Sequence, residues 1–410
     1  MSAETRPTCD FDVLDGSFYL DPHPQYAWMR AHCPIFWDDT HELWVLTRHA
    51  DVSYVSTHPE LFCSGKGIRP THSADLSLVA LDGERHLRQR RLVNKGFSPR
   101  MIRAMEDRVR QVVMEVLDAI APRGTCDFVA DVAVPVPLVV IAELMGLPVE
   151  DRGLLGKWSD RMMAGEGRSD LDDPVLADAG AAFGEFVAYL ADLIEDRRQA
   201  LRGGSEVPED IISILVAAEE EGVLESHEEL TQDELTMFLV VLLVAGNETT
   251  RNAIAGGMWA LSQFPDQWRR LCEDPTLFKT MADEVCRYVS PVISFTRTTT
   301  QPVVLHGQHL GADEKVLMLY QSANRDEDVF DEPDALRLDR SPNPHIAFGV
   351  GPHVCLGANL ARLEIRVLFE ELTRRFAAIS VSSGHAAQYN QHALVHSIEA
   401  LPVEYPPRLD

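Results

Sequence analysis

The stretch Phe348-Gly349-Val350-Gly351-Pro352-His353-Val354-Cys355-Leu356-Gly357 says most about the fold of this 410-residue chain. Its three glycines allow the backbone to curl closely around a flat, bulky group. The helix-forming sequence Ala358-Asn359-Leu360-Ala361-Arg362-Leu363-Glu364 follows directly. Cys355 is therefore expected just before a helix N-terminus, where backbone N–H groups and the helix dipole favour a thiolate.

A thiolate held in this way suits the fifth ligand of a haem iron in an oxygen-activating site. The simplest alternative is an inert cysteine in a glycine-rich loop, because free cysteine is among the most often buried residues. The complete pattern Phe-Gly-x-Gly-x-His-x-Cys-x-Gly favours the iron ligand.

With this pattern the chain resembles the bacterial, soluble cytochromes P-450, which are haem-thiolate monooxygenases, over nearly its full length. Within that family it is most similar to actinobacterial enzymes that hydroxylate sterol or steroid side chains. The resemblance implies a mostly α fold with small β-sheets and haem b (iron protoporphyrin IX) between the long central helix and the Cys355 loop. It also implies dioxygen as co-substrate, Cys355 as the iron ligand, and haem contacts from Phe348, Gly349, His353 and Gly357.

Composition and charge narrow the class of protein further. A net charge of −27 argues against nucleic acid or an anionic membrane surface as a partner. The apolar runs 134–147 and 238–245 are shorter than the ~20 residues that span a bilayer, and residues 1–12 lack the apolar core of a signal peptide. The seven cysteines contain no C-x-x-C pair, so neither a disulfide framework nor a zinc site is expected. We expect one domain over residues 1–410, in the cytoplasm, without membrane insertion.

Hydrophobic periodicity predicts a mostly helical chain with short strands. Thr231 and Glu234 form a capping-box pattern that opens a long apolar helix ending near Gln263. Helical periodicity dominates from Ser98 to about Gly222. The other predicted elements are strands at 35–37, 43–47, 378–381 and 400–404, a short hairpin at 303–310 that turns at 306–308, and a final helix at 358–376.

The sequence Ala245-Gly246-Asn247-Glu248-Thr249-Thr250 interrupts the long apolar helix. Gly, Asn and paired Thr weaken a helix centre, and a carboxylate in an apolar run is costly unless it is paired or functional. We interpret it as a break in the helix that makes room for dioxygen; the alternative is a kink with a satisfied polar patch. By resemblance Glu248 and Thr249 are the catalytic acid–alcohol pair that delivers protons, and Ala245 and Gly246 line the haem.

Glu284 and Arg287 are three residues apart on a predicted helix, which on its own describes an ordinary surface pair. The resemblance gives them another meaning, because the family carries an E-x-x-R pair at this distance before its Cys loop. It implies that the pair joins Arg340 in a buried scaffold behind that loop.

Four cations match positions that hold the haem propionates in the family: His86, Arg90, Arg297 and His353. Arginine and histidine suit carboxylates because charge-assisted hydrogen bonds are strong. Taken one by one, each would more often be a solvated surface residue.

The substrate-facing positions implied by the resemblance are mostly small, aliphatic or aromatic, which fits a hydrophobic small molecule, although any of them could instead fill core. They are Ile68, Leu78, Val79, Val244, Val292, Ile293, Phe295 and Val395.

No flavin or nicotinamide domain fits beside this fold in 410 residues. Electrons must therefore come from a separate ferredoxin or flavodoxin with its NAD(P)H reductase. A docking patch for such an acidic carrier is predicted from basic residues near the haem, although these could also form a solvated helix face. They are Arg85, Arg88, Arg91, Lys95, Arg362 and Arg366.

The sequence thus predicts a monooxygenase that inserts one oxygen atom into a C–H bond of a sterol or steroid side chain. A terpenoid or a polyketide intermediate is the alternative substrate. A non-catalytic haem sensor or carrier is the alternative of another class, and a peroxide-driven enzyme is a third; the Glu248–Thr249 pair argues against both.

Overall fold

The computed structural model describes residues 6–70, 77–165, 168, 170, 172–220, 231–376, 378–382, 384, 387–390 and 394–406. The helices are α1 His23–His32, α2 His49–Thr57, α3 Gly83–Val93, α4 Pro99–Ala104, α5 Glu106–Ile120, α6 Pro135–Met145, α7 Arg152–Ala164, α8 Pro174–Arg202, α9 Ile211–Glu220, α10 Gln232–Gln263, α11 Pro265–Glu273, α12 Met281–Val289, α13 Tyr320–Ala323 and α14 Ala358–Arg375. The strands are β1 Ile35–Asp38, β2 Leu43–Leu46, β3 Phe62–Cys63, β4 Thr125–Asp127, β5 Ser294–Thr299, β6 Val303–Leu305, β7 Gln308–Leu310, β8 Lys315–Leu319, β9 Ser380–Val381 and β10 Pro402–Glu404.

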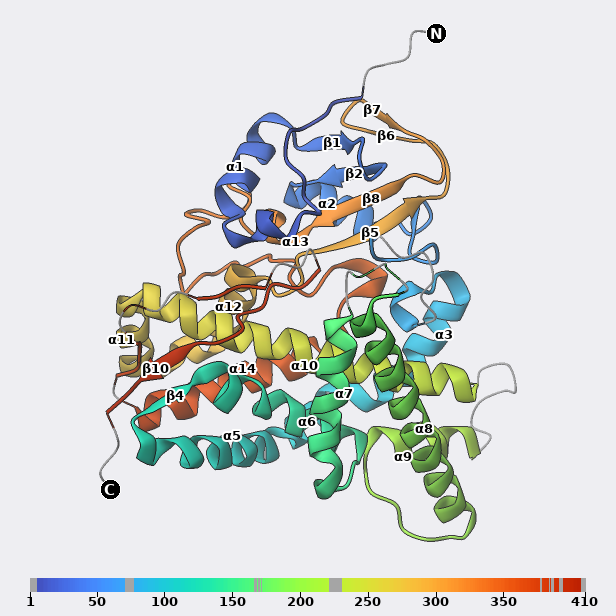
Figure 1. Cartoon of the computed structure of the whole chain (residues 1–410), viewed down its shortest axis with the longest axis vertical. Helices are drawn as coiled ribbons and strands as arrows, with labels where there is room; N and C mark the ends of the chain where they lie inside the picture. The colour runs from blue at the N-terminus through green and yellow to red at the C-terminus, as the bar shows by residue number, and fades with distance from the viewer. Residues whose placement is uncertain are drawn as a thin grey trace.

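The elements divide into a strand-rich region and a larger helical region (Figure 1). The main sheet has the strand order β1-β2-β8-β5-β3, and α1 and α2 lie beside it. Helices α5, α6, α10 and α14 pack together in the helical region, with α10 running through its middle. The smaller sheets are β4-β10-β9 and β6-β7.

Most predicted elements are found. Strands β1 and β2 form the expected antiparallel hairpin, with Ile35 opposite Leu46. Strands β6 and β7 turn at His306 and Gly307, which both have positive φ. The final helix ends at Arg375, one residue earlier than predicted.

The long stretch predicted as helical contains one strand that the periodicity did not indicate. Gly124, at φ 71°, ends the turn after α5, and Thr125–Asp127 then pairs with β10 from the far end of the chain. Such a short strand is defined by its distant partner, so its own sequence carries little signal.

Helix α10 begins at the predicted capping box. The Glu234 N–H donates to Thr231 Oγ1 at 3.1 Å, and the Thr231 N–H donates to Glu234 Oε2 at 3.0 Å. The helix then runs for 32 residues and is buried on nearly every face, as its apolar sequence predicts. It therefore forms the axis of the helical core.

By length and composition alone, α8 could cross a membrane, with 22% of its most apolar window buried. Its contacts with α7, α9 and α10 are those of a helix packed on a larger body. Long core helices of water-soluble proteins pass the same test, so this feature is weak support for a membrane span.

Candidate functional site

Cys355 lies at the end of a tightly folded loop that leads into α14. Its N–H donates to the Phe348 carbonyl oxygen at 2.8 Å, which closes the loop on itself. Gly349 and Gly351 have φ of 68° and 81°, which favours glycine at both positions. A Cβ at Gly351 would lie 2.5 Å from the Ser56 carbonyl oxygen, so glycine also allows the loop to pack against α2. The Cys355 side chain itself is exposed.

The surrounding protein has two opposing effects on the pKa of the Cys355 thiol. Desolvation by the surrounding protein raises the pKa of the thiol. The N–H groups of Gly357 and Ala358 and the charges of Arg90 and Arg362 lower that pKa, as expected at a helix N-terminus. Desolvation is the larger effect. A bound metal cation deprotonates a coordinating thiol outright, so the site suits a thiolate that forms on metal binding.

The small residues of α10 present an accessible surface within an otherwise buried helix. Ala245 is exposed, and Gly246 and Thr249 are partly exposed, whereas Asn247, Glu248 and Thr250 are buried. The predicted break at this point is wrong, because α10 is continuous from Gln232 to Gln263. The Thr249 hydroxyl donates to the Ala245 carbonyl oxygen at 2.6 Å, a side-chain bond to i−4 that a continuous helix accommodates.

Glu248 turns away from Thr249 and packs against α7. Its Oε2 lies 2.6 Å from the Arg251 guanidinium, and its Oε1 accepts a 3.4 Å hydrogen bond from Ser159 Oγ. Arg251 also contacts Asp160 at 3.2 Å. Burial raises the pKa of Glu248 to about 7 against the opposing charge of Arg251, and Asp160 adds to the increase. The carboxyl can therefore bind or release a proton near neutral pH.

The sequence indicated neither Arg251, Ser159 nor Asp160 as partners of Glu248. Arg251 could have been found, because it lies three residues after Glu248 on the same helix. Ser159 and Asp160 come from α7, and only the packing of α7 on α10 brings them near.

The four predicted propionate ligands come together from α3, β5 and the Cys355 loop. The His86 and His353 rings stack with centroids 4.1 Å apart. Arg90 donates to the Val354 carbonyl oxygen beside Cys355. Arg297, on β5, lies close enough that its charge helps lower the pKa of His353 to about 3, after burial as the main cause. The carboxylate of Asp82 also lies near these four residues, with its Oδ1 4.0 Å from His353 Nε2.

These residues fit the haem that the resemblance implies. Cys355 supplies an exposed sulfur at a helix N-terminus, and Ala245 and Gly246 supply small residues on a helix. Two arginines and two histidines gather in one place, which suits the two propionate carboxylates of a haem. His86 Nε2 is buried and has no hydrogen-bond partner within the described chain, which is costly unless a further group binds there.

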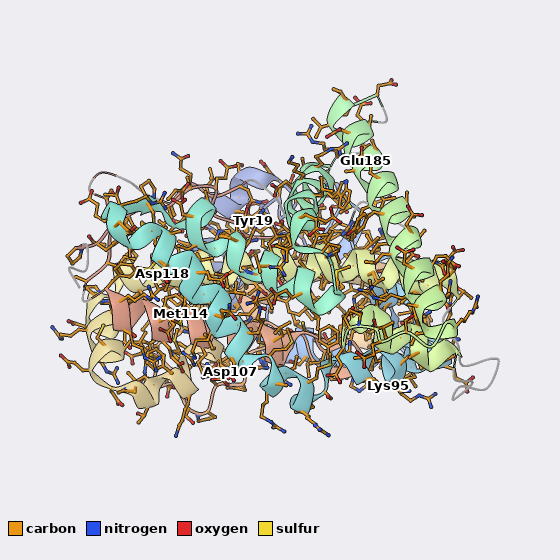
Figure 2. The ribbon with its side chains drawn as sticks, turned by 90° about the horizontal axis from the view of Figure 1, so that it is seen from below. Tyr19, Lys95, Asp107, Met114, Asp118 and Glu185 are labelled. Atoms are coloured by element: carbon orange, nitrogen blue, oxygen red, sulfur yellow. The ribbon has the colours of Figure 1, made fainter. Side chains whose placement is uncertain are left out.

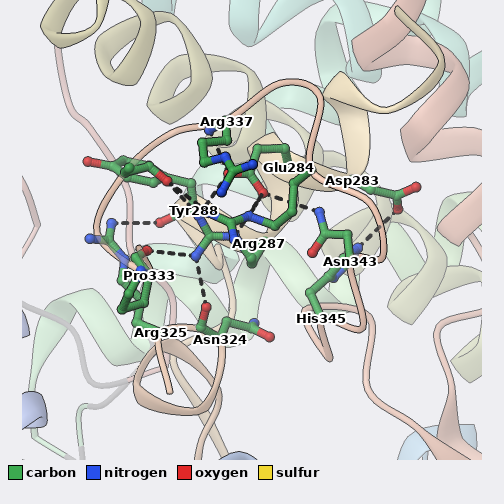
Figure 3. A network of polar contacts seen from close by, with 12 residues as sticks. Asp283, Glu284, Arg287, Tyr288, Asn324, Arg325, Pro333, Arg337, Asn343 and His345 are labelled. Atoms are coloured by element: carbon green, nitrogen blue, oxygen red, sulfur yellow. Dashed lines mark hydrogen bonds and ion pairs between the residues drawn. The ribbon is translucent and has the colours of Figure 1, made fainter. Parts of the chain in front are cut away.

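Glu284 and Arg287 form a completely buried ion pair (Figure 3), which Arg340 joins. Arg287 Nε and Nη2 each lie 2.8 Å from a Glu284 oxygen, and Arg340 Nε lies 3.0 Å from Oε2. Asn343 Nδ2 and the Arg337 N–H also donate to Glu284. Backbone carbonyl oxygens accept the remaining Arg287 donors: Asn324 at 3.0 Å, Pro333 at 2.8 Å and Ala335 at 2.9 Å.

A second ion network, not indicated by the sequence, joins α12 to α14 and the Cys355 loop. Asp283 Oδ1 lies 2.6 Å from Arg362 Nε and 3.0 Å from His345 Nε2. The Arg362 guanidinium also lies 4.4 Å from the centre of the Phe348 ring. The residue before Glu284 therefore helps to fix the segment that precedes Cys355.

Several predicted substrate positions gather around β5. Val292 pairs with Val395 in an isolated bridge, and the Thr296 N–H donates to the Ile68 carbonyl oxygen at 2.8 Å. Phe295 is partly exposed. Ile293 points to the other side, where it is fully buried among Tyr19, Leu317 and their neighbours. We therefore withdraw Ile293, because its side chain is fully buried in a cluster separate from the one that Val292 and Phe295 pack against. Leu78 is buried in the main core, and Val79 and Val244 are partly exposed.

Three comparisons with known proteins agree with this geometry. Residues 171–397 match the family model described as Cytochrome P450. The chain is 36% identical to a steroid C26-monooxygenase of Mycolicibacterium smegmatis, over 98% of this chain and 97% of that protein. It is 38% identical to a methyl-branched lipid omega-hydroxylase of Mycobacterium tuberculosis, over 97% and 92%. The structure of Mycobacterium marinum cytochrome P450 CYP268A2 in complex with pseudoionone superimposes with a TM-score of 0.87 and 31% identity, over 98% and 100%.

Proposed function

Because the chain belongs to the cytochrome P450 family, we propose that it hydroxylates the end of a steroid or sterol side chain. Family membership makes it a haem monooxygenase that uses dioxygen on a hydrophobic substrate. The assignment of the substrate class is supported by the similarity to a steroid C26-monooxygenase along nearly the whole of both chains. The monooxygenase relatives also set aside the alternative of a non-catalytic haem carrier.

A methyl-branched lipid is the second candidate substrate. It is favoured by the relative named as an omega-hydroxylase of such lipids. C26 of a steroid and the omega carbon of a lipid are both terminal carbons of an alkyl chain. The two candidates therefore share one reaction, the insertion of oxygen at the end of a branched apolar tail.

We assign roles to the residues of the site as follows. Haem, when bound, carries out the oxidation, and the protein supplies ligation, placement and protons. Cys355 would bind the iron as a thiolate, and His86, Arg90, Arg297 and His353 would hold the two propionates. The Glu248 carboxyl stores a proton next to Arg251 and Ser159, and Thr249 Oγ1 donates a hydrogen bond at the accessible face of α10. Apolar residues around β5 place the tail.

We expect affinity to follow the length of the alkyl tail. Each buried methylene contributes ~0.8 kcal/mol, which corresponds to roughly a fourfold change in the dissociation constant. A series of steroid ketones with progressively shortened side chains should therefore bind about fourfold more weakly for each carbon removed. The measurement is a titration of the substrate-induced blue shift of the Soret band.

The same titration separates the substrate classes. Methyl-branched fatty acids that bind more tightly than any sterol would move the assignment to the second candidate. A response that does not depend on tail length, or tighter binding of a compact monoterpene, would contradict both.

Thr249→Ala should uncouple electron consumption from product formation while haem and substrate still bind. A positioned proton donor typically contributes ~100-fold or more, and the variant lacks the hydroxyl beside Ala245. The measurement is product formed per NAD(P)H consumed with a reconstituted redox partner. Thr250→Ala is the matched control, because Thr250 is the next residue on α10 and is buried.

Glu248→Gln tests the proton store by its pH dependence. The carboxyl is mainly protonated below the pKa of about 7 and mainly charged above it, so wild-type coupling should fall as the pH rises through 7. The variant cannot titrate and should lose this transition. Coupling that is unchanged in both Thr249→Ala and Glu248→Gln would remove the two residues from the mechanism.

Like other members of its family, the enzyme needs a redox partner; we propose a ferredoxin or flavodoxin with its reductase, acting in the cytoplasm.

The predicted docking patch needs correction, because most of its cations form ion pairs within the protein. Arg85 and Arg88 pair with Glu234, Arg362 pairs with Asp283, and Arg366 pairs with Glu106 and Glu370. Four exposed cations on and beside α3 and α4 make no ion pair within the described residues: Arg91, Lys95, Arg100 and Arg103. Lys95 lies at the rim of the molecule (Figure 2). We propose these four as the docking patch.

Charge reversal in this patch should slow electron transfer. Lys95→Glu combined with Arg100→Glu should lower the rate constant for reduction by roughly tenfold or more at low salt, because steering by opposite charges accelerates association. The difference from wild type should shrink as salt is added. Lys157→Glu on α7 is the control with the same type of charge change. Equal rates in the patch variant and the control would contradict the patch.

A further inference from the structure

We propose that Cys9 and Cys33 are a modification site, a thiol pair that is oxidised to a disulfide joining the N-terminal segment to the end of α1. Their sulfur atoms lie 2.9 Å apart, although 24 positions separate them in the sequence. A disulfide bond is ~2.05 Å long, so closure requires the sulfurs to approach by less than about 1 Å. Both residues are free cysteines in this structure, and both are partly buried.

The backbone on both sides of the pair is held in place. Cys33 caps α1, and its N–H donates to the Met29 carbonyl oxygen at 2.9 Å. Two residues before Cys9, the Pro7 carbonyl oxygen accepts a 2.7 Å hydrogen bond from the Trp37 N–H of β1. The Arg6 guanidinium lies 3.8 Å from the centre of the Trp37 ring. The approach of the two sulfurs is therefore built into the packing of the segment along β1.

Both cysteines pack against the same hydrophobic cluster. This cluster includes Tyr19, Tyr26, Met29 and Phe36, and it holds the N-terminal segment against the main sheet. None of these residues belongs to the haem site. A bond between Cys9 and Cys33 would therefore tie the segment to α1 without contacting the residues that bind haem or deliver protons.

Hydrogen peroxide is the oxidant that we name, and it is also the by-product expected when oxygen activation is uncoupled. The sulfur of Cys9 attacks one peroxide oxygen, the O–O bond breaks, water leaves and a sulfenic acid forms. The thiol of Cys33 then attacks the oxidised sulfur, and a second water leaves as the S–S bond forms. In sum, two thiols and one peroxide give one disulfide and two waters. Burial and the contact with Cys9 raise the pKa of Cys33 to about 12, which disfavours Cys33 as the first thiol to attack the peroxide.

The test uses the full-length holoprotein, first reduced and then exposed to a small excess of hydrogen peroxide. After denaturation and alkylation, peptide mass mapping should find Cys9 and Cys33 joined and protected from the alkylating agent. A crosslink restricts the unfolded chain, so the midpoint of thermal unfolding should rise by roughly 3 °C. Reduction should restore the original midpoint.

Matched serine variants make the result specific. Cys9→Ser and Cys33→Ser should each abolish the crosslink and the thermal shift, whereas Cys63→Ser and Cys272→Ser should keep both. Exposed Cys272 also reports that the peroxide has acted. Wild-type protein in which Cys272 is oxidised while positions 9 and 33 still carry two alkylated thiols would overturn the proposal. A thermal shift that persists in Cys33→Ser would overturn it as well.

Discussion

Cys355→His is expected to abolish the thiolate-type spectrum and, with it, monooxygenase activity. Reduced, carbonyl-bound wild-type protein should show the long-wavelength Soret band of a thiolate-ligated haem, and the variant should show that of a histidine-ligated haem. The loss of turnover should exceed the ~10–100-fold that loss of an outer hydrogen-bond partner of a metal site costs, because the ligand itself is changed.

The physical reason lies in the loop around the sulfur. The Cys355 N–H is fixed to the Phe348 carbonyl oxygen, and the N–H groups of Gly357 and Ala358 favour negative charge on this sulfur. Cys63→Ser is the control, because Cys63 is a partly buried cysteine in β3. A thiolate-type band that survives in Cys355→His would show that another residue binds the iron.

Glu284→Ala or Arg287→Ala should give apoprotein or aggregated protein instead of an enzyme with altered kinetics. Both side chains are completely buried, and removing one leaves the other charge uncompensated, at a cost of about 3–5 kcal/mol. That is a large fraction of the ~5–15 kcal/mol by which folded proteins are stable. The measurements are the ratio of haem to protein after purification and the midpoint of thermal unfolding.

The chain offers an exposed pair with the same spacing as a control. Asp266 and Arg269 are 2.9 Å apart on α11, with side chains 78% and 66% exposed. Asp266→Ala should therefore cost less than ~1 kcal/mol and leave the haem content unchanged. If Glu284→Ala behaves like Asp266→Ala, the buried network is not the scaffold that we describe.

Features encoded in short stretches of sequence were the most predictable ones. The capping box at Thr231, the hairpin of β1 and β2 and the helix after Cys355 each depend on neighbouring residues, and each was found within a residue or two. The enclosed contacts of Glu284 with Arg287 and Arg340 were expected only through the family resemblance, because the same spacing also describes a surface pair.

Features that arise from packing could not be predicted in the same way. Strand β4 depends on β10, and Asp160 and Ser159 reach the Glu248 network only through the contact of α7 with α10. The break predicted in α10 is absent: the helix is continuous from Gln232 to Gln263 and accommodates the bond from Thr249 Oγ1 to the Ala245 carbonyl oxygen. The ion pair of Arg88 with Glu234 and the contact between Cys9 and Cys33 likewise join residues that are distant in sequence.

Turnover under oxygen-18 gas tests the central claim most directly. The holoenzyme, a ferredoxin, its reductase, NADPH and cholest-4-en-3-one should give a product with a new terminal hydroxyl group. That group should carry one oxygen-18 atom from the gas and none from labelled water. A product whose new oxygen comes from water, or a bound sterol that is never oxidised while a reference substrate is, would contradict the account.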